Sequence, residues 1–209
     1  MRSGSVRETI FDDVFDSQRV IRTLLEVLAR PGTVGSLPAL DYRFPPEDFC
    51  APALSIMKTL CDHRVSFSVG APAHRAAWVR YLEVNLATPV AEPADAGYVL
   101  FDGSSFDEDF SRLSTGCLEF PEASATALLG VGLLESLPRE NGSTGMATLR
   151  LSGPGVKATA SLRVAGLDPR YLEQRARANR FYPLGIDLLL VDRDGRVAGI
   201  PRTSAIEVS

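Results

Sequence analysis

Short apolar segments in the second half of the chain constrain its fold more than any other feature. Residues 125–134 are almost entirely apolar, as expected of a strand covered on both faces of a sheet. Further on, apolar residues 186–191 and 196–200 flank the sequence Asp-Arg-Asp-Gly. Because Gly195 can adopt the positive φ that a tight loop demands, these two segments predict a hairpin.

Helices are predicted between and before these strands. Apolar residues spaced by four from Val20 predict an amphipathic helix that begins at a polar N-cap, Asp16, and ends at residues 30–32. The other expected elements are a helix opened by Pro45 and Pro46, strands at 65–69 and 98–101, a helix at 73–85, pairing strands at 146–151 and 156–164, and a basic helix at 169–180. This order predicts an α/β fold with a mixed sheet flanked by helices.

The composition limits the architecture and the partners. A chain of 209 residues with 45% hydrophobic content can bury one core, so residues 1–209 are expected to form a single domain. A formal net charge of -4 argues against binding to nucleic acid or anionic lipid, because both attract clustered Lys and Arg. No apolar run reaches the roughly 20 residues of a membrane helix, and the N-terminus lacks a signal-peptide core. These features predict a cytoplasmic protein.

The cysteines and histidines do not form a recognised metal motif. Three cysteines, Cys50, Cys61 and Cys117, argue against a disulfide framework and are interpreted as buried small hydrophobes. Cys50, Cys61, His63 and His74 have side chains that zinc prefers, but their spacing matches no known finger. We therefore expect no metal site.

Motifs for catalysis are also absent from the sequence. There is no nucleophile elbow of the Gly-x-Ser-x-Gly type and no phosphate loop, since residues 141–145 lack the necessary lysine and are interpreted as a turn. The acidic residues Asp102 and 107–109 are interpreted as a solvated loop leading into a short helix. No catalytic residue and no cofactor are predicted.

Arginines offer the best candidate contacts for an anion. Arg202 and Thr203 follow the predicted hairpin, where a forked guanidinium can hold phosphate or phosphonate oxygens. The structural alternative is that Arg202 pairs with Asp187 or Glu207 and fixes the C-terminal tail. The arginines of the helix at 169–180 are expected mainly on a solvated face, with an anionic partner or ligand as the lesser alternative.

A second group of candidates lies near the middle of the chain. Ser114 and Thr115 have hydroxyls that can bind an anion or cap a helix, and Glu122 lies in a sharp turn just after them. The structural interpretation, as turn and capping residues, is favoured for this group.

Several of these segments resemble one known family. Residues 181–190 (FYPLGIDLLL), 198–203 (AGIPRT) and 206–208 (IEV) are similar to the closing signature of the PhnH family, the H subunits of the bacterial carbon-phosphorus lyase system. Residues 114–116 with 121–126 resemble the central block of that family. Residues 19–32 resemble its opening helix, and residues 149–156 add a weaker match.

The resemblance implies a particular fold and set of partners. It implies the shape of the large domain of pyridoxal-phosphate-dependent transferases, without the cofactor. It also implies a homodimer that joins the G, I and J subunits in a core complex. That complex exchanges the adenine of ATP for an alkylphosphonate, which gives a ribose 1-phosphonate 5-triphosphate. No catalytic residue of the family can be transferred to this chain.

Three functional hypotheses follow. The first is a subunit of the phosphonate-activating complex, inactive alone, with the C-terminal tail and residues 114–122 packed together at an interface. The second is a stand-alone enzyme for a phosphorylated small molecule, with Arg202 and Thr203 as anion ligands and Asp187 or Glu122 as general base. The third is a dimer that binds a small anion such as ATP or an alkylphosphonate without transforming it.

Overall fold

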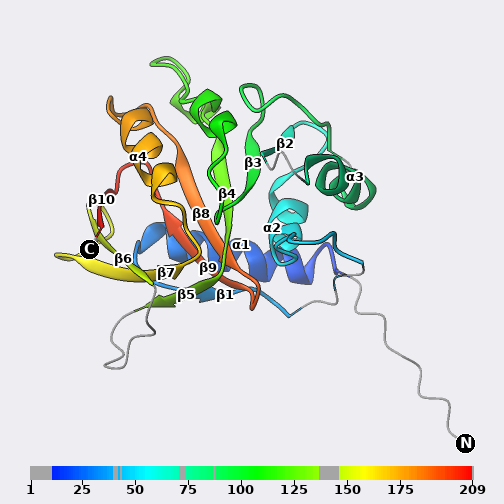
Figure 1. The fold of residues 1–209 in the computed structure, drawn as a ribbon, viewed down its shortest axis with the longest axis horizontal. Helices are drawn as coiled ribbons and strands as arrows, with labels where there is room; N and C mark the ends of the chain where they lie inside the picture. The colour runs from blue at the N-terminus through cyan, green and yellow to red at the C-terminus, as the bar shows by residue number, and fades with distance from the viewer. Residues whose placement is uncertain are drawn as a thin grey trace, which may run out of the picture.

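A six-stranded mixed sheet forms the centre of the computed structural model, which describes residues 11–39, 42, 44–70, 74–86, 88–136 and 146–208 (Figure 1). Its strands are β1 (Gly35–Ser36), β2 (Phe67–Gly70), β3 (Tyr98–Asp102), β4 (Thr126–Val131), β8 (Asp187–Asp192) and β9 (Arg196–Ile200). They lie in the order β1-β9-β8-β4-β3-β2. β2, β3, β4 and β8 run parallel, while β9 is antiparallel to both of its neighbours.

The central strands of this sheet are buried on both faces. Leu128 of β4 pairs in register with Leu100 of β3 and Leu189 of β8, and none of the three is more than 1% exposed. Together they face the core beneath α1 (Phe15–Ala29), α2 (Ala53–Leu60) and α3 (Arg75–Asn85). Because side chains alternate along a strand, residues one position away face a second core on the opposite side.

That second core is closed by one helix and a smaller sheet. Within the described residues this sheet has four antiparallel strands in the order β10-β6-β7-β5. The strands are β5 (Leu133–Ser136), β6 (Ala147–Ser152), β7 (Ala160–Ala165) and β10 (Ala205–Val208), and the helix is α4 (Pro169–Ala178). In Figure 1 the smaller sheet and α4 lie on the left, while α2 and α3 lie on the right.

The predicted α/β fold with a mixed sheet flanked by helices is confirmed. The hairpin of β8 and β9 is also confirmed. Gly195 has a φ of 80°, and its N–H donates to the carbonyl oxygen of Asp192 at 3.1 Å. The acidic loop leads into the expected short helix, η1 (Glu108–Arg112).

The single strand predicted at 125–134 is wrong, because the chain changes sheets within it. Gly132 separates β4 from β5, and its N–H donates to the carbonyl oxygen of Ala165 in β7 at 2.9 Å. The strand predicted at 156–164 begins only at Ala160. Gly153 and Gly155 both have positive φ, so the chain turns there before it can enter the strand.

The start of the second helix is also corrected. It begins at Ala53, and not at Pro45. Phe44 and Asp48 have φ values of 49° and 58°, which no α-helix can include. Pro45 therefore lies in an irregular segment that precedes the helix.

The N-cap predicted for the first helix is wrong, because the N-cap position is Val14 and not Asp16. Asp16 lies inside α1, whereas Oδ1 of Asp12 accepts hydrogen bonds from the N–H groups of Val14 and Phe15. The short strands β1 and β10 were not predicted. In the part of the chain that the structure describes, no helix is long and apolar enough to cross a bilayer.

Candidate functional site

The turn after β9 connects the two sheets. The N–H of Ser204 donates to the carbonyl oxygen of Pro201 at 2.9 Å, and the chain then enters β10, which pairs with β6. Arg202 and Thr203 occupy this turn. The side chain of Arg202 is 18% exposed, and Thr203 is exposed.

Arg202 forms a close ion pair with Asp187 at the start of β8. Its Nη2 and Nε lie 2.6 and 3.2 Å from Oδ2 of Asp187, and its backbone N–H donates to Oδ1 at 2.6 Å. The structure thus contains the pairing that was weighed against a ligand-binding role. With both carboxylate oxygens of Asp187 engaged, this pair joins the turn to the central sheet. A role for Arg202 in binding an anion remains a prediction.

The C-terminal tail, residues 183–208, lies against residues 114–126, which contain the central block. The remaining Nη1 of Arg202 donates to the carbonyl oxygen of Pro121 at 2.7 Å. The backbone N–H of Gly185 donates to the carbonyl oxygen of Thr115 at 3.0 Å. Two segments distant in sequence therefore meet through one guanidinium and one backbone hydrogen bond.

Within the central block, hydroxyl and backbone groups hold a turn. Oγ of Ser114 donates to the carbonyl oxygen of Ala123 at 3.0 Å and accepts from the N–H of Gly116 at 3.2 Å. Thr115 pairs with Ser124 in an isolated antiparallel bridge. These contacts lead into the short helix η2 (Pro121–Ala123), so Ser114 has the structural role expected of a turn residue.

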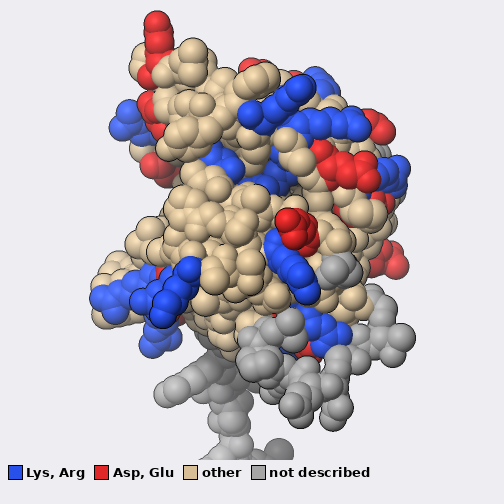
Figure 2. Space-filling view, turned by 90° about the vertical axis from the view of Figure 1, so that its left-hand side faces the viewer, with Lys and Arg blue, Asp and Glu red and all other residues tan. Residues whose placement is uncertain are grey.

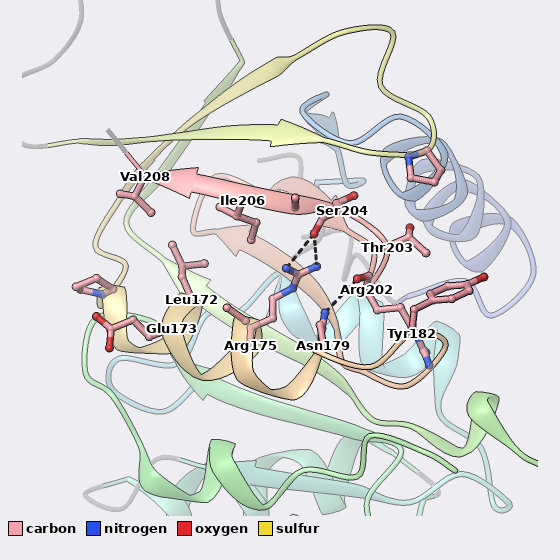
Figure 3. A pocket seen from close by; sticks show the side chains of 14 residues that line it. Leu172, Glu173, Arg175, Asn179, Tyr182, Arg202, Thr203, Ser204, Ile206 and Val208 are labelled. Atoms are coloured by element: carbon pink, nitrogen blue, oxygen red, sulfur yellow. Dashed lines mark hydrogen bonds between the residues drawn. The ribbon is translucent and has the colours of Figure 1, made fainter. Parts of the chain in front are cut away.

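Four of the six candidate residues line two separate hollows. Ser114 and the exposed Glu122 line a hollow of about 320 Å³. Arg202 and Thr203 line a different hollow of about 860 Å³, which lies between α4 and β10 and which we call the α4–β10 hollow (Figure 3). Thr115 and Asp187 line neither. The candidate residues therefore join two segments of the chain, and Arg202 contributes positive charge. Among these six residues, no nucleophile lies beside a base.

Arg175 of α4 lines this hollow. Its predicted place on a solvated face is wrong. It is only 3% exposed, and its Nη2 donates to the carbonyl oxygen of Pro201 at 2.6 Å. Nη2 also donates to the carbonyl oxygen of Ser204 at 3.2 Å (Figure 3). Burial lowers the pKa of Arg175 to about 10, which still leaves the guanidinium charged at neutral pH. A sequence signal existed, because Tyr171 lies four residues earlier on the same buried face of the helix.

Asn179, at the C-terminal end of α4, was not singled out from the sequence. Its Nδ2 donates to the carbonyl oxygens of Ile186 at 3.1 Å and Arg202 at 3.3 Å, and its Oδ1 accepts from the N–H of Ile186 at 2.7 Å. It therefore fixes α4 to β8 and to the turn after β9. In contrast, Arg177 and Arg180 are exposed, as the solvated-face interpretation predicts.

The cysteines differ from one another in burial. Cys50 is buried, and burial raises the pKa of its thiol to about 12; the same cause raises the pKa of the half-buried Cys61 to about 12. Cys117 is exposed, so its interpretation as a buried hydrophobe is wrong. Among the described residues, no three side chains of the metal-binding types lie close enough together to hold an ion.

Comparisons with known proteins agree over nearly the whole chain. Residues 9–207 match the family described as bacterial phosphonate metabolism protein (PhnH). The chain is 27% identical over 197 residues to the alpha-D-ribose 1-methylphosphonate 5-triphosphate synthase subunit PhnH of Rhizobium meliloti (strain 1021), covering 94% of this chain and 92% of that protein. It is 33% identical over 191 residues to the putative C-P lyase subunit protein HtxG of Stutzerimonas stutzeri, covering 91% and 86%. The chain therefore belongs to the PhnH family of bacterial phosphonate metabolism proteins.

Proposed function

We propose that this chain is a subunit of the carbon-phosphorus lyase complex, where it assists the synthesis of α-D-ribose 1-methylphosphonate 5-triphosphate from ATP and methylphosphonate. The observation that carries this proposal is the end-to-end similarity to two proteins named as subunits of such systems. The candidate site supports a role that is not catalytic in isolation. Its charged groups are engaged in holding segments of the chain together, and its two hollows separate Glu122 from Arg202.

The surface beside the C-terminal tail is suited to contact with another subunit. Four large apolar side chains are exposed close in sequence to the atoms that join the tail and the central block: Leu118 (77%), Phe120 (56%), Phe181 (69%) and Tyr182 (76%). We call these four residues the junction surface. A contiguous patch of exposed apolar side chains typically marks a site of protein contact, and we propose that these four residues form one.

Co-expression with the G, I and J subunits tests the proposal. We expect the chain to purify with them as one complex, and we expect Phe181→Asp to remove it from that complex. The new carboxylate would lose its water at an apolar contact and gain no charged partner there, which is unfavourable. The matched control is Val84→Asp, because Val84 is 81% exposed on α3, on the other side of the molecule in Figure 1.

The outcome that contradicts the subunit role is failure of the unmodified chain to join the other subunits. If Phe181→Asp and Val84→Asp both join as well as the unmodified chain, the subunit role stands and the junction surface is wrong. Turnover of phosphonates or nucleotides by the purified chain alone would instead favour the stand-alone enzyme.

Further features of the family resemblance belong to the same proposal. We propose one domain over residues 1–209, a homodimer in the cytoplasm, and the shape of the large domain of pyridoxal-phosphate-dependent transferases without the cofactor. The four parallel strands support that shape. A site for ATP or an alkylphosphonate shared with another subunit would use Arg202 and Thr203, and size-exclusion chromatography with light scattering tests the dimer.

A further inference from the structure

We propose that the α4–β10 hollow binds a small organic oxyanion, with its charged group at Arg175 and its apolar part against Leu172, Ile206 and Val208. Arg202 and Thr203 line the same hollow, so this inference rests on the proposed function and names the class of ligand that the isolated chain would bind there. Figure 2 looks onto the side of the molecule that carries α4 and β10, where Lys and Arg atoms lie recessed among uncharged surface. Figure 3 shows the hollow from close by.

The first observation is a buried positive charge without a carboxylate of its own. No carboxylate of the described residues lies within 4.0 Å of the Arg175 guanidinium, and Asp187, whose charge acts on it, is paired with Arg202. The two arginines and Asp187 together carry one net positive charge. A buried charge is normally paired, so an anionic group is the missing partner.

The second observation is that hydrogen-bonding groups beside this charge have no partner. Nε of Arg175 and Oγ of Ser204 are both shielded from solvent and make no hydrogen bond with the described residues. Both residues line the hollow. An oxyanion is suited to this position, because its oxygens accept from a guanidinium and from a hydroxyl at once.

The third observation is the apolar surface at one end of the hollow. In Figure 3, Leu172, Ile206 and Val208 gather on one side of Arg175, and the carboxylate of Glu173 points away from it. Val208 is 54% exposed. A ligand with an apolar substituent would bury this surface, which a bare inorganic ion cannot do.

The size of the hollow favours a small molecule over a protein segment. Its volume of about 860 Å³ falls within the range of small-molecule sites, which are mostly apolar with a few convergent polar groups. The hollow has this composition, with a single buried guanidinium among mainly apolar side chains. A partner segment is the alternative that the experiment must separate.

Isothermal titration calorimetry with the purified full chain tests the site. The probes are phenylphosphonate and benzoate, which carry both an oxyanion and an apolar ring, inorganic phosphate, which has only the charge, and benzyl alcohol, which is uncharged. We expect phenylphosphonate or benzoate to bind at least about tenfold more tightly than phosphate and benzyl alcohol. The tighter of the two identifies the class of oxyanion.

A blocking variant locates the binding. Ala176 is exposed on α4 and lines the hollow, so Ala176→Trp places a bulky ring in the hollow and should leave Arg175 and its hydrogen bonds in place. We expect this variant to bind the preferred probe at least about tenfold more weakly. The matched control is Arg177→Ala, because Arg177 is exposed on the same helix and does not line the hollow. Arg175→Met should also lose binding, and circular dichroism checks that it folds.

Two results would overturn the proposal. The first is no heat with phenylphosphonate and benzoate at millimolar concentration, and the second is equal binding of the preferred probe by Ala176→Trp and the unmodified chain. If the first result comes together with loss of Ala176→Trp from the assembled complex, the hollow belongs to a partner segment. An Ala176→Trp chain that joins the complex but no longer binds the probe supports the small-molecule site.

Discussion

The centre of the large sheet and the α4–β10 end of the molecule are stabilised by different interactions. At the centre, Leu100, Leu128 and Leu189 pack side by side with no polar side chain among them. At the α4–β10 end, Arg175 and Asn179 donate to backbone carbonyls of the chain around the turn after β9. The first region depends on burial of apolar area, and the second on a few directional hydrogen bonds.

This difference explains where a site can form. Apolar packing leaves neither charge nor unpaired donors, so the sheet centre offers nothing for a polar ligand to contact. The α4–β10 end has to hold a turn between two sheets, and it does so with arginines. Once Arg175 is buried for that purpose, its charge and its unpartnered Nε remain for a ligand.

The largest expected effect is at the sheet centre. Leu128→Ala should lower the free energy of unfolding by about 2–5 kcal/mol, because it leaves a cavity among side chains that cannot close over it. Urea unfolding followed by circular dichroism measures the change. Leu25→Ala is the control, since Leu25 is 60% exposed on α1 and should change stability by less than about 1 kcal/mol. Equal effects of the two variants would show that the centre is not closely packed.

The next effect is expected at the ion pair of the tail. Asp187→Asn should lower the free energy of unfolding by about 1–3 kcal/mol, because the half-buried Arg202 guanidinium loses its charged partner. The control is Asp194→Asn, which removes a partner of Arg196 at a site 67% exposed and should cost less than about 1 kcal/mol. If Asp187→Asn were as mild as its control, the directional contacts at this end would contribute little to stability.

The sequence predicts the sheet centre far better than the α4–β10 end. The apolar residues 186–191 and the turn at Gly195 are local signals, and a local pattern is enough to predict a buried strand and a hairpin. The break at Gly132 was missed, because entry into the second sheet depends on pairing with β7, which is distant in sequence.

The residues of the candidate site show why charge alone misleads. Arg175 and Arg177 lie two residues apart in a basic helix, and an arginine-rich sequence by itself predicts a solvated face. What buries Arg175 is the turn after β9, whose carbonyls of Pro201 and Ser204 face the helix. The spacing of Tyr171 and Arg175 indicates a shared face of the helix, but it does not specify that contact. The Arg202–Asp187 pair was anticipated as one of two alternatives, with Glu207 as the other partner, because pairs of arginine and carboxylate commonly fix a chain segment.

A smaller effect, dependent on pH, is expected at the start of α4. Asp168 caps this helix by accepting from the N–H of Arg170 at 3.0 Å, and hydrogen bonding with the Arg170 side chain lowers the pKa of Asp168 from 3.8 to about 2. A lowered pKa stabilises the fold above pH 3.8, and this contribution is lost as the pH falls toward 2. Asp168→Ala should therefore cost about 1 kcal/mol at neutral pH.

Measuring that variant against pH sharpens the comparison of the two regions. Chemical denaturation at each pH gives the free energy of unfolding of Asp168→Ala and of the unmodified chain. The difference between these two free energies should shrink as the pH falls from about 4 to about 2. The difference in free energy of unfolding between Leu128→Ala and the unmodified chain should stay constant over the same pH range, because this substitution removes no titrating group. A constant difference for Asp168→Ala would mean that the cap does not act through the charged carboxylate.

The smallest effect is expected at Arg177, and it tests whether position on α4 decides the role of an arginine. Arg177→Ala removes an exposed side chain with no hydrogen bond to the chain that we describe, so its free energy of unfolding should change by less than about 0.5 kcal/mol. Arg175→Ala should cost clearly more in the same urea titration, because the carbonyls of Pro201 and Ser204 lose their donor. If the two variants were equally mild, Arg175 would not be holding the turn. The α4–β10 end would then depend on apolar burial, as the sheet centre does.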